Sequence, residues 1–187
     1  MNEVLKMIHE RRSVRDYKPT KIDALDLATI LEAGRHAPSA WNGQPWHFTV
    51  VQKKSLLDRI AEVARDALPE KEAALVEAQP WLVAPDFHYF YHSPCAIFIS
   101  GQKDSKSAMA DCAVGMMNML YAAESLGIQT CIVQTALVAL ETEYGDGFRK
   151  DLELPENYDP LYVLVLGYTS ESLPMAAPRK DNFVNYI

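Results

Sequence analysis

Three arginines and one serine lie together near the start of the chain, in the segment Arg11-Arg12-Ser13-Val14-Arg15. Residues 1–21 hold six basic and three acidic side chains, whereas the whole chain of 187 residues carries a net charge of −7. A guanidinium group can donate two parallel hydrogen bonds to phosphate oxygens, and a serine hydroxyl adds another donor. The segment therefore predicts a site for a small phosphorylated ligand, with a charged helix end in solvent as the alternative.

A second group of polar side chains stands in the stretch 37–46, between a predicted helix and a predicted strand. Its prolines and glycine favour a turn-rich connection. Its hydroxyl and amide groups could also donate and accept hydrogen bonds at the edge of a heteroaromatic ring such as uracil. The side chains of the stretch that carry such groups are Ser39, Asn42 and Gln44.

The usual backbone motifs for phosphate are missing from the sequence. None of the 8 glycines forms Gly-x-Gly-x-x-Gly or a Gly-Lys-Ser/Thr loop, so side chains must hold a phosphate if one binds. That requirement strengthens the case for the arginines. His-Glu-x-x-His and Gly-x-Ser-x-Gly are also absent, which leaves zinc-hydrolase and serine-esterase interpretations without an anchor.

The aromatic segment around residues 88–92 contains two histidines four positions apart, a spacing that suits a metal on a helical face. No carboxylate lies within the segment, and its neighbours are aromatic, so we predict no metal site. Packing or the lining of a cleft is the preferred interpretation. The candidate cleft residues are Trp41, His88, Tyr89, Phe90 and Tyr91.

Composition limits the class of protein. A hydrophobic content of 49% over 187 residues predicts a single domain, 1–187, with a sizeable core. An isoelectric point near 5.2 argues against nucleic acid as a partner, and the longest apolar stretches are too short to span a membrane. Three cysteines without a Cys-x-x-Cys pair indicate neither a disulfide framework nor a zinc site. With no recognisable secretory signal, we expect a cytoplasmic protein.

Apolar spacing and capping residues predict how these groups are positioned. Helices are expected over 3–11, from Asp23 to before Pro38, and over 55–67, 70–78, 108–126 and 139–152, with Asn2 and Ser55 as further caps. Strands are expected over 46–52, 95–100, 128–133 and 162–166. The tail from Thr169 to Ile187 ends in apolar residues and is expected to pack on a second subunit.

Taken in order, these stretches resemble the FMN-dependent nitroreductase family. The motifs that carry the resemblance are Arg11–Arg15, Ala37–Ala40 with Asn42 and Gln44–Trp46, Asp111–Gly127, and Val165–Tyr168 followed by Pro178–Lys180. The resemblance implies an α+β three-layer fold, with a central mixed, mainly antiparallel sheet flanked by helices. It also implies an intertwined homodimer with an extended C-terminal tail. Residues 69–94, where this family shapes its acceptor pocket, match none of its motifs.

The resemblance also implies the roles of individual residues around a tightly bound FMN. The phosphate and ribityl chain would be held by Arg11, Arg12 and Ser13, with Arg179 or Lys180 from the tail. Arg15 would lie near N1 and the C2 carbonyl and tune the redox chemistry. The ring would be contacted by Pro38, Ser39, Asn42 and Gln44, in part across the dimer, and by Ile132, Val133 and Gln134.

The implied function is an NAD(P)H oxidoreductase that reduces nitroaromatics or quinones by a ping-pong mechanism, with no side-chain nucleophile. One alternative is a reductive dehalogenase of the same family, for which Glu70, Lys71 and Glu72 could supply a lid. Two further hypotheses are a flavin-binding or storage protein without turnover, and a generic α/β phosphate binder.

Overall fold

Four antiparallel strands form the central sheet of the computed structural model, which describes residues 1–180 and 183–187. The strands are β1 (Trp46–Val51), β2 (Cys95–Gln102), β3 (Gln129–Val133) and β4 (Tyr158–Gly167), in the order β1-β2-β4-β3. All four predicted strands are confirmed. β4 begins four residues earlier than expected because Pro160 pairs with Ser100 beside a bulge, where a missing N–H is tolerated.

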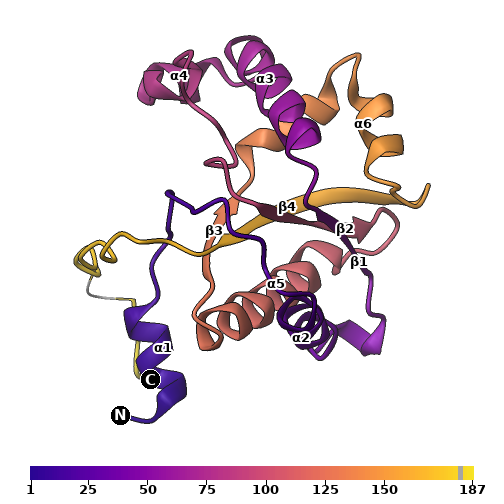
Figure 1. Ribbon diagram of the computed structural model, residues 1–187. Coiled ribbons are helices and arrows are strands. Elements are labelled where there is room, and N and C mark those ends of the chain that lie inside the picture. The colour runs from indigo at the N-terminus through magenta and orange to yellow at the C-terminus, as the bar shows by residue number, and fades with distance from the viewer. Residues whose placement is uncertain (181–182) are drawn as a thin grey trace.

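Helices cover both faces of this sheet (Figure 1). One layer contains α3 (Lys54–Lys71), the 3-10 helix η3 (Thr135–Glu141) and α6 (Gly145–Asp151), and the other contains α2 (Ala24–Arg35) and α5 (Ala108–Ser125). Three shorter elements complete the chain: η1 (Ala40–Asn42), α4 (Ala73–Ala78) and η2 (Pro80–Val83). The three-layer α+β fold expected from the sequence is confirmed. The four named strands pair antiparallel, and an isolated parallel bridge joins Ser13 to Thr130 on β3.

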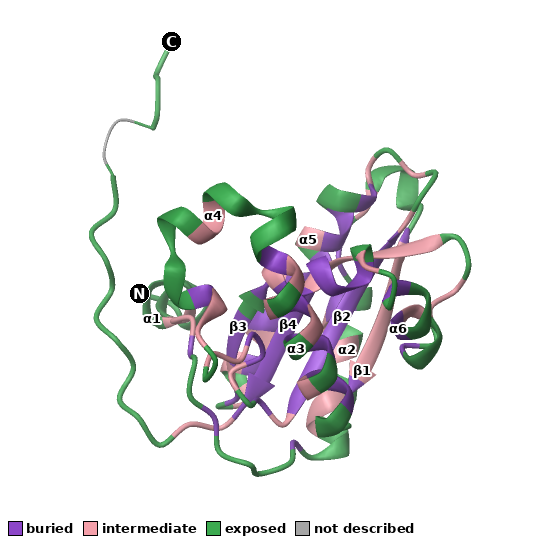
Figure 2. Ribbon diagram, turned by 90° about the horizontal axis from the view of Figure 1, so that it is seen from above, coloured by how far each residue is buried: buried purple, intermediate pink, exposed green. Residues whose placement is uncertain are grey.

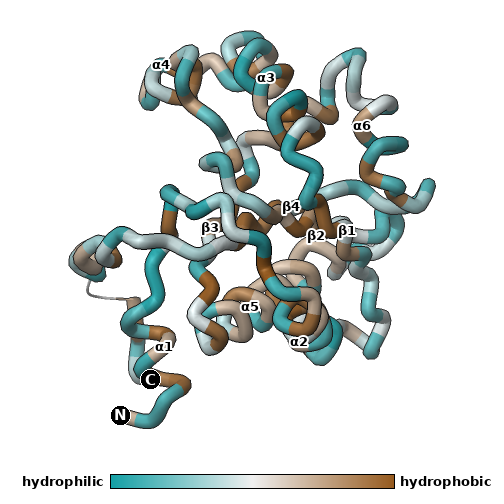
Figure 3. Tube along the Cα trace, in the orientation of Figure 1, coloured by the Kyte–Doolittle hydropathy of each residue, from teal (hydrophilic) through white to brown (hydrophobic). Residues whose placement is uncertain are grey.

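Side chains that alternate along β2 and β4 fill the two halves of the core. Phe98 and Val163 pack toward α3 and η3, whereas Ile97 and Leu164 pack toward α2 and α5. Because both faces are buried, the central strands are apolar almost throughout, as the band of hydrophobic residues between the helical layers in Figure 3 illustrates.

The predicted helix caps are confirmed at two helix starts and wrong at a third. The carboxamide of Asn2 accepts from the N–H of Leu5 at 2.9 Å, and Asp23 accepts from Leu25 at 2.8 Å. Ser55 was expected to start the third helix, but α3 begins at Lys54 without a side-chain cap. Asp58, the expected capping-box partner, instead binds Lys54 Nζ at 2.7 and 2.8 Å.

The single helix predicted over 139–152 is also wrong, because the chain there forms two helices separated by an extended Thr142. The Thr142 hydroxyl donates to the carbonyl of Ala139 at 2.7 Å and accepts from the N–H of Tyr144 at 3.2 Å. A hydroxyl that bonds the local backbone competes with the helical hydrogen-bond pattern, which explains the break.

Two segments project from this layered body. α1 (Glu3–Glu10) has no buried residue, and Val4, Leu5 and Ile8 on it are 45–60% exposed. The described tail residues beyond Gly167 have no helix or strand and extend away from the sheet (Figure 2). Among the described residues, no helix has the length and apolar character to cross a membrane.

Candidate functional site

The arginine segment (Arg11–Arg15) runs along the outer edge of β3. Ser13 forms a parallel bridge with Thr130, and the N–H of Val14 donates to the carbonyl of Thr130 at 3.0 Å. The side chain of Val14 is buried, and the hydroxyl of the buried Tyr17 donates to the carbonyl of Val14 at 2.6 Å. Because successive side chains of an extended segment point to opposite sides, burial of Val14 turns Ser13 and Arg15 toward the surface.

The two leading arginines have different surroundings. Arg12 donates to three backbone carbonyls, those of His9 at 2.7 Å, Arg11 at 2.8 Å and Pro174 at 3.0 Å. It therefore ties the end of α1 to the first part of the tail. The guanidinium of Arg11 has no hydrogen bond or ion pair with the residues that the structure describes, so its five N–H groups are available to a ligand.

Arg15 is held by an aromatic side chain from a distant part of the sequence. Its Nε donates to the hydroxyl of Tyr91 at 3.3 Å, and its Cζ lies 5.8 Å from the centroid of the Tyr91 ring. Burial is the largest single influence on the pKa of Arg15 and acts to lower it. The hydrogen bond to Tyr91 and the electrostatic interactions with Cys131, Tyr91 and Tyr17 together outweigh burial, so the pKa lies above its ordinary value. A fixed positive charge therefore stands at the surface, beside a hollow of about 280 Å³ between the arginine segment and the start of the tail.

The edge of β3 continues this surface. Residues of an antiparallel strand direct their backbone groups alternately to its two neighbours. Since Thr130 bonds the arginine segment, Ile132 two residues later presents its backbone groups to the same edge. The Ile132 side chain is 39% exposed, whereas Val133 is buried in the core. Gln134 is exposed and donates to the carbonyl of Leu161 at 3.4 Å. The fold thus brings two of the predicted ring and phosphate segments together.

The amide loop (residues 38–44) lies elsewhere, before β1 at the opposite edge of the sheet (Figure 1). Three strand spacings across the sheet amount to about 14 Å. Along the strands, Trp46 pairs with Gly101 on β2, and Gly101 pairs with Asp159 on β4. Thr130 pairs with Leu166, which lies seven residues further along β4. Those seven positions of β4 add about 23 Å along the strands. One chain therefore does not bring Pro38, Ser39, Asn42 and Gln44 to the arginine segment.

The amide loop is nevertheless rigidly built. Trp41, Asn42 and Gln44 have φ angles of 55°, 55° and 45°, a left-handed conformation that non-glycine residues adopt only under local constraint. The N–H of Gln44 donates to the Ser39 hydroxyl at 3.0 Å, and its carboxamide donates to Asn42 at 3.1 Å.

The buried carboxylate of Asp111 also holds the amide loop. Its Oδ1 accepts from the N–H of Ala40 at 3.2 Å, and its Oδ2 has no partner among the described residues. Asp111 was named from the sequence only as part of a helix. The signal that could have found it is a single carboxylate in the first turn of an apolar helix.

Several candidate cleft residues are placed differently from expectation. Tyr89 and Phe90 are buried in the half of the core that lies between the sheet and α3, so their side chains face the protein interior. Trp41 is fully exposed, and His88 bonds Asp58. Arg179 lies in the exposed tail and makes no hydrogen bond or ion pair within the described part of the chain.

A separate hollow of about 640 Å³ lies between α3 and the turn that precedes α6. Five carboxylate side chains line it, together with Lys71 and Tyr144: Glu62, Asp66, Glu70, Glu141 and Glu143. Its charge is wrong for a phosphate. Glu70 and Lys71 of the predicted dehalogenase lid therefore line the same hollow as a tyrosine from a distant part of the sequence.

Comparison with known proteins identifies the family. The family model described as "Nitroreductase family" matches residues 8–168. The chain belongs to the nitroreductase family. A crystal structure of a nitroreductase with bound FMN from Bacteroides fragilis covers 100% of both chains, with a TM-score of 0.89 and 30% sequence identity.

Two further proteins are similar to this chain in sequence. An Archaeoglobus fulgidus protein with the provisional name NADH dehydrogenase/NAD(P)H nitroreductase is 33% identical over 174 residues, covering 91% of this chain and 88% of its own. The FMN reductase [NAD(P)H] of Bacillus subtilis is 28% identical over 195 residues, covering 91% and 68% of the two chains.

Proposed function

We propose that this nitroreductase binds FMN, takes hydride from NAD(P)H and passes it to electron-poor acceptors such as nitroaromatics or quinones by a ping-pong mechanism. The observation that carries the proposal is the charged Arg15 beside the exposed edge of β3. The same segment carries Ser13 and Arg11, and Arg11 has no partner among the described residues. The FMN in the Bacteroides fragilis relative and the names of the other two relatives support it.

The donors on this surface fit two parts of FMN: the phosphate, which is anionic, and the pyrimidine end of the ring, which gains negative charge when the flavin is reduced. Arg11 and Ser13 offer N–H and O–H donors for the phosphate, while Arg15 offers a fixed positive charge for the pyrimidine end of the ring. FMN, when bound, supplies the hydride chemistry. The chain binds and orients it, and Arg15 stabilises negative charge on the ring. Tyr17 and Val14 fix the backbone that carries these groups.

We also propose a homodimer in which the amide loop of one subunit completes the site of the other. One chain keeps the amide loop and the arginine segment at diagonally opposite corners of the sheet, so a second copy is needed to bring them together. The exposed apolar face of α1 and the exposed tail residues Phe183, Val184, Tyr186 and Ile187 offer surface for that contact.

A visible spectrum and an anaerobic titration test the function. Purified protein incubated with FMN and desalted is expected to remain yellow, and NADH or NADPH without oxygen is expected to bleach the flavin absorbance. Protein that stays colourless would refute FMN binding. Colour that persists with both donors would favour a flavin-binding protein without turnover. Size-exclusion chromatography with light scattering checks the dimer.

One observation favours the second candidate, a reductive dehalogenase, because Glu70, Lys71 and Tyr144 line the same hollow. That hollow shares no residue with the arginine segment, so we prefer the NAD(P)H reductase. Turnover of a halotyrosine with dithionite, without turnover of nitroaromatics with NAD(P)H, would reverse the preference. We further propose a cytoplasmic location, because the three cysteines are free and buried, as is usual in a reducing compartment.

A further inference from the structure

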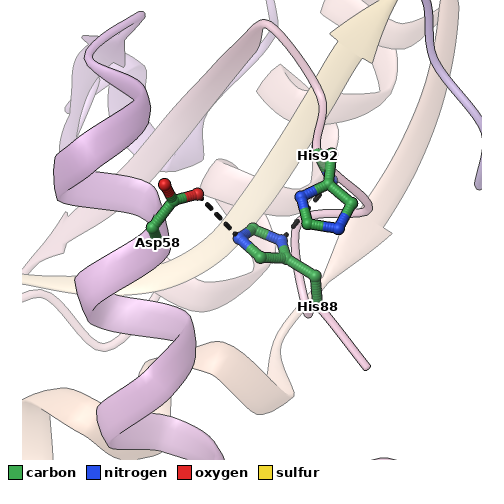
Figure 4. A group of neighbouring side chains, drawn as sticks. All are labelled: Asp58, His88 and His92. Atoms are coloured by element: carbon green, nitrogen blue, oxygen red, sulfur yellow. Dashed lines mark hydrogen bonds and ion pairs between the residues drawn. The ribbon is translucent and has the colours of Figure 1, made fainter. Parts of the chain in front are cut away.

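The turn formed by residues 88–92 is built around one histidine ring. The Nδ1 of His88 accepts the backbone N–H of Phe90 at 3.2 Å and that of His92 at 3.4 Å. Both donors are backbone groups that can only donate, so Nδ1 must be unprotonated. The neutral ring then carries its proton on Nε2, which lies 3.2 Å from Asp58 Oδ1 and donates to it (Figure 4).

This hydrogen-bond pattern decides against a metal ion at the same place. The ligand atoms of Asp58, His88 and His92 lie within 4.8 Å of one another, as in many metal sites. A histidine that binds a metal through one nitrogen carries its proton on the other and donates it to an acceptor. Here Nδ1 of His88 faces two N–H donors, so binding through Nε2 would leave the ring proton in conflict with them. The cluster is therefore a hydrogen-bonded latch between α3 and the turn.

Burial and neighbouring charges keep the latch in this form at neutral pH. Desolvation acts to raise the pKa of Asp58, but the hydrogen bond and charge of Lys54, with His88, lower it overall, so the carboxylate is ionised. Burial, helped by the neighbouring His92, lowers the pKa of His88 and keeps the ring neutral. Both states are those that the hydrogen bonds require.

The latch holds the backbone of Tyr91 in an unusual conformation. Tyr91 and His92 both have a φ of 52°, and such left-handed residues persist only where the surroundings fix them. Phe90, fully buried beside Phe98, anchors the same turn in the core. The Tyr91 ring packs edge-on against Phe87 with centroids 5.9 Å apart. Its hydroxyl, which burial keeps protonated by raising the pKa of Tyr91, accepts the hydrogen bond from Arg15.

We propose that Tyr91 is a positioning residue for Arg15, and that the Asp58–His88 pair latches the turn that presents Tyr91 to it. The inference rests on the proposed flavin chemistry, since it gives Arg15 a fixed location from which to act. Arg15 is otherwise exposed, and its other hydrogen bond, to the carbonyl of Ser13, is long at 3.4 Å. Without Tyr91 the Arg15 guanidinium would sample several positions in solvent, and its charge would no longer be held beside the proposed flavin ring.

A double-mutant cycle in the FMN-loaded protein tests the positioning role. Tyr91→Phe keeps the ring and removes the hydroxyl, and it is expected to slow flavin reduction by NAD(P)H about threefold to tenfold, the effect of one hydrogen bond, with FMN affinity unchanged. In an Arg15→Ala background the same change is expected to have no further effect, because the residue it positions is gone. Tyr158→Phe is the matched control, because Tyr158 is half-buried on β4, lies outside this turn and makes no side-chain hydrogen bond with the described residues.

The latch is tested separately by Asp58→Ala, which is expected to reproduce most of the Tyr91→Phe effect. Lys54→Ala removes the ion pair with Asp58 but not the latch, because the ordinary pKa of 3.8 already keeps the Asp58 carboxylate ionised at neutral pH. The flavin of this variant is expected to be reduced at the wild-type rate. Wild-type rates in Tyr91→Phe, or equal losses in both Arg15 backgrounds, would overturn the inference while leaving the proposed function intact.

A flavin-independent measurement covers the case in which the protein binds no FMN. The Arg15 Nε–H is expected to give a slowly exchanging NMR signal in the wild-type chain and a fast-exchanging one in Tyr91→Phe. Identical exchange in the two proteins would overturn the positioning role on its own. We expect titration with Zn²⁺ to show no saturable binding at this cluster. Saturable Zn²⁺ binding that His92→Ala abolishes would overturn the latch.

Discussion

The different surroundings of Arg11 and Arg12 predict different roles, with Arg11 binding the FMN phosphate and Arg12 stabilising the local backbone. Arg11 has no partner among the described residues, whereas Arg12 donates to the carbonyls of His9, Arg11 and Pro174. We expect Arg11→Ala to lose a charge-assisted hydrogen bond to the FMN phosphate, which contributes about 1.5–3 kcal/mol. That free energy corresponds to an FMN Kd about 10- to 150-fold weaker.

The Arg12→Ala variant should behave differently, because the hydrogen bonds that the Arg12 side chain makes join it to the protein backbone. They lie at exposed or half-buried positions, so solvent weakens them and their joint loss should cost about 1–2 kcal/mol. The cost should appear as local opening of α1 and of the tail near Pro174, with an FMN Kd changed by less than about fivefold.

Two measurements separate the variants. FMN titration followed by fluorescence gives the Kd, and amide hydrogen exchange over residues 3–10 and 170–176 reports the local opening. Arg11→Lys is the matched control, since it keeps the charge and loses the forked geometry. An Arg11→Ala protein that binds FMN within threefold of wild type would refute the division. So would an Arg12→Ala protein that loses FMN without faster exchange.

Substitutions at four further positions test packing and electrostatics elsewhere in the fold. Asp111→Ala removes the acceptor for the amide loop and should cost about 1–2 kcal/mol in urea unfolding, whereas Asp111→Asn keeps the acceptor and should cost less; equal losses would contradict this role. Gly101→Ala would place its Cβ 2.5 Å from a leucine methyl on β4 and should cost about 1–3 kcal/mol. Gly147→Ala in α6 meets open space and should stabilise by about 0.5–1 kcal/mol, and thermal unfolding compares the two glycines. Burial raises the pKa of Glu124 above its ordinary 4.5, although Arg11 opposes this, so the folded state binds more protons than the unfolded state and stability falls as pH rises through the folded pKa. Glu124→Gln should therefore be more stable than wild type at pH 7 and lose that advantage below the ordinary value of 4.5, and a parallel loss at both pH values would contradict the argument.

Much of the secondary structure could be predicted because its signals act over a few residues. A capping side chain bonds an N–H two or three positions away, as Asn2 and Asp23 do, and Gly127, with a φ of 72°, ends α5. The wrong predictions of helix starts and lengths arose where a side chain formed hydrogen bonds that the sequence pattern did not indicate. Asp58 could not act as a capping residue because Lys54 and His88 bind it, and Thr142 breaks a helix by bonding its own backbone.

The candidate site was predictable in its parts but not in its arrangement. The arginine segment and Ile132–Gln134 were named from the sequence, but they share one edge of the sheet because a parallel bridge joins Ser13 to Thr130. The separation of the amide loop follows from strand order, which no local pattern of residues specifies. That separation is what makes a second subunit part of the proposed site.

The sequence by itself determined which chemical groups this nitroreductase has available: a cationic segment with one hydroxyl, a loop of amides, and strands apolar enough to be buried on both faces. The tertiary structure alone decided which groups meet. Residues 89–91 are consecutive aromatics, yet Tyr89 and Phe90 enter the core while Tyr91 reaches Arg15, 76 positions away. Asp58 likewise meets His88 across 30 positions. Such contacts depend on how helices pack against a twisted sheet, and that geometry is set by the whole core rather than by neighbours in sequence.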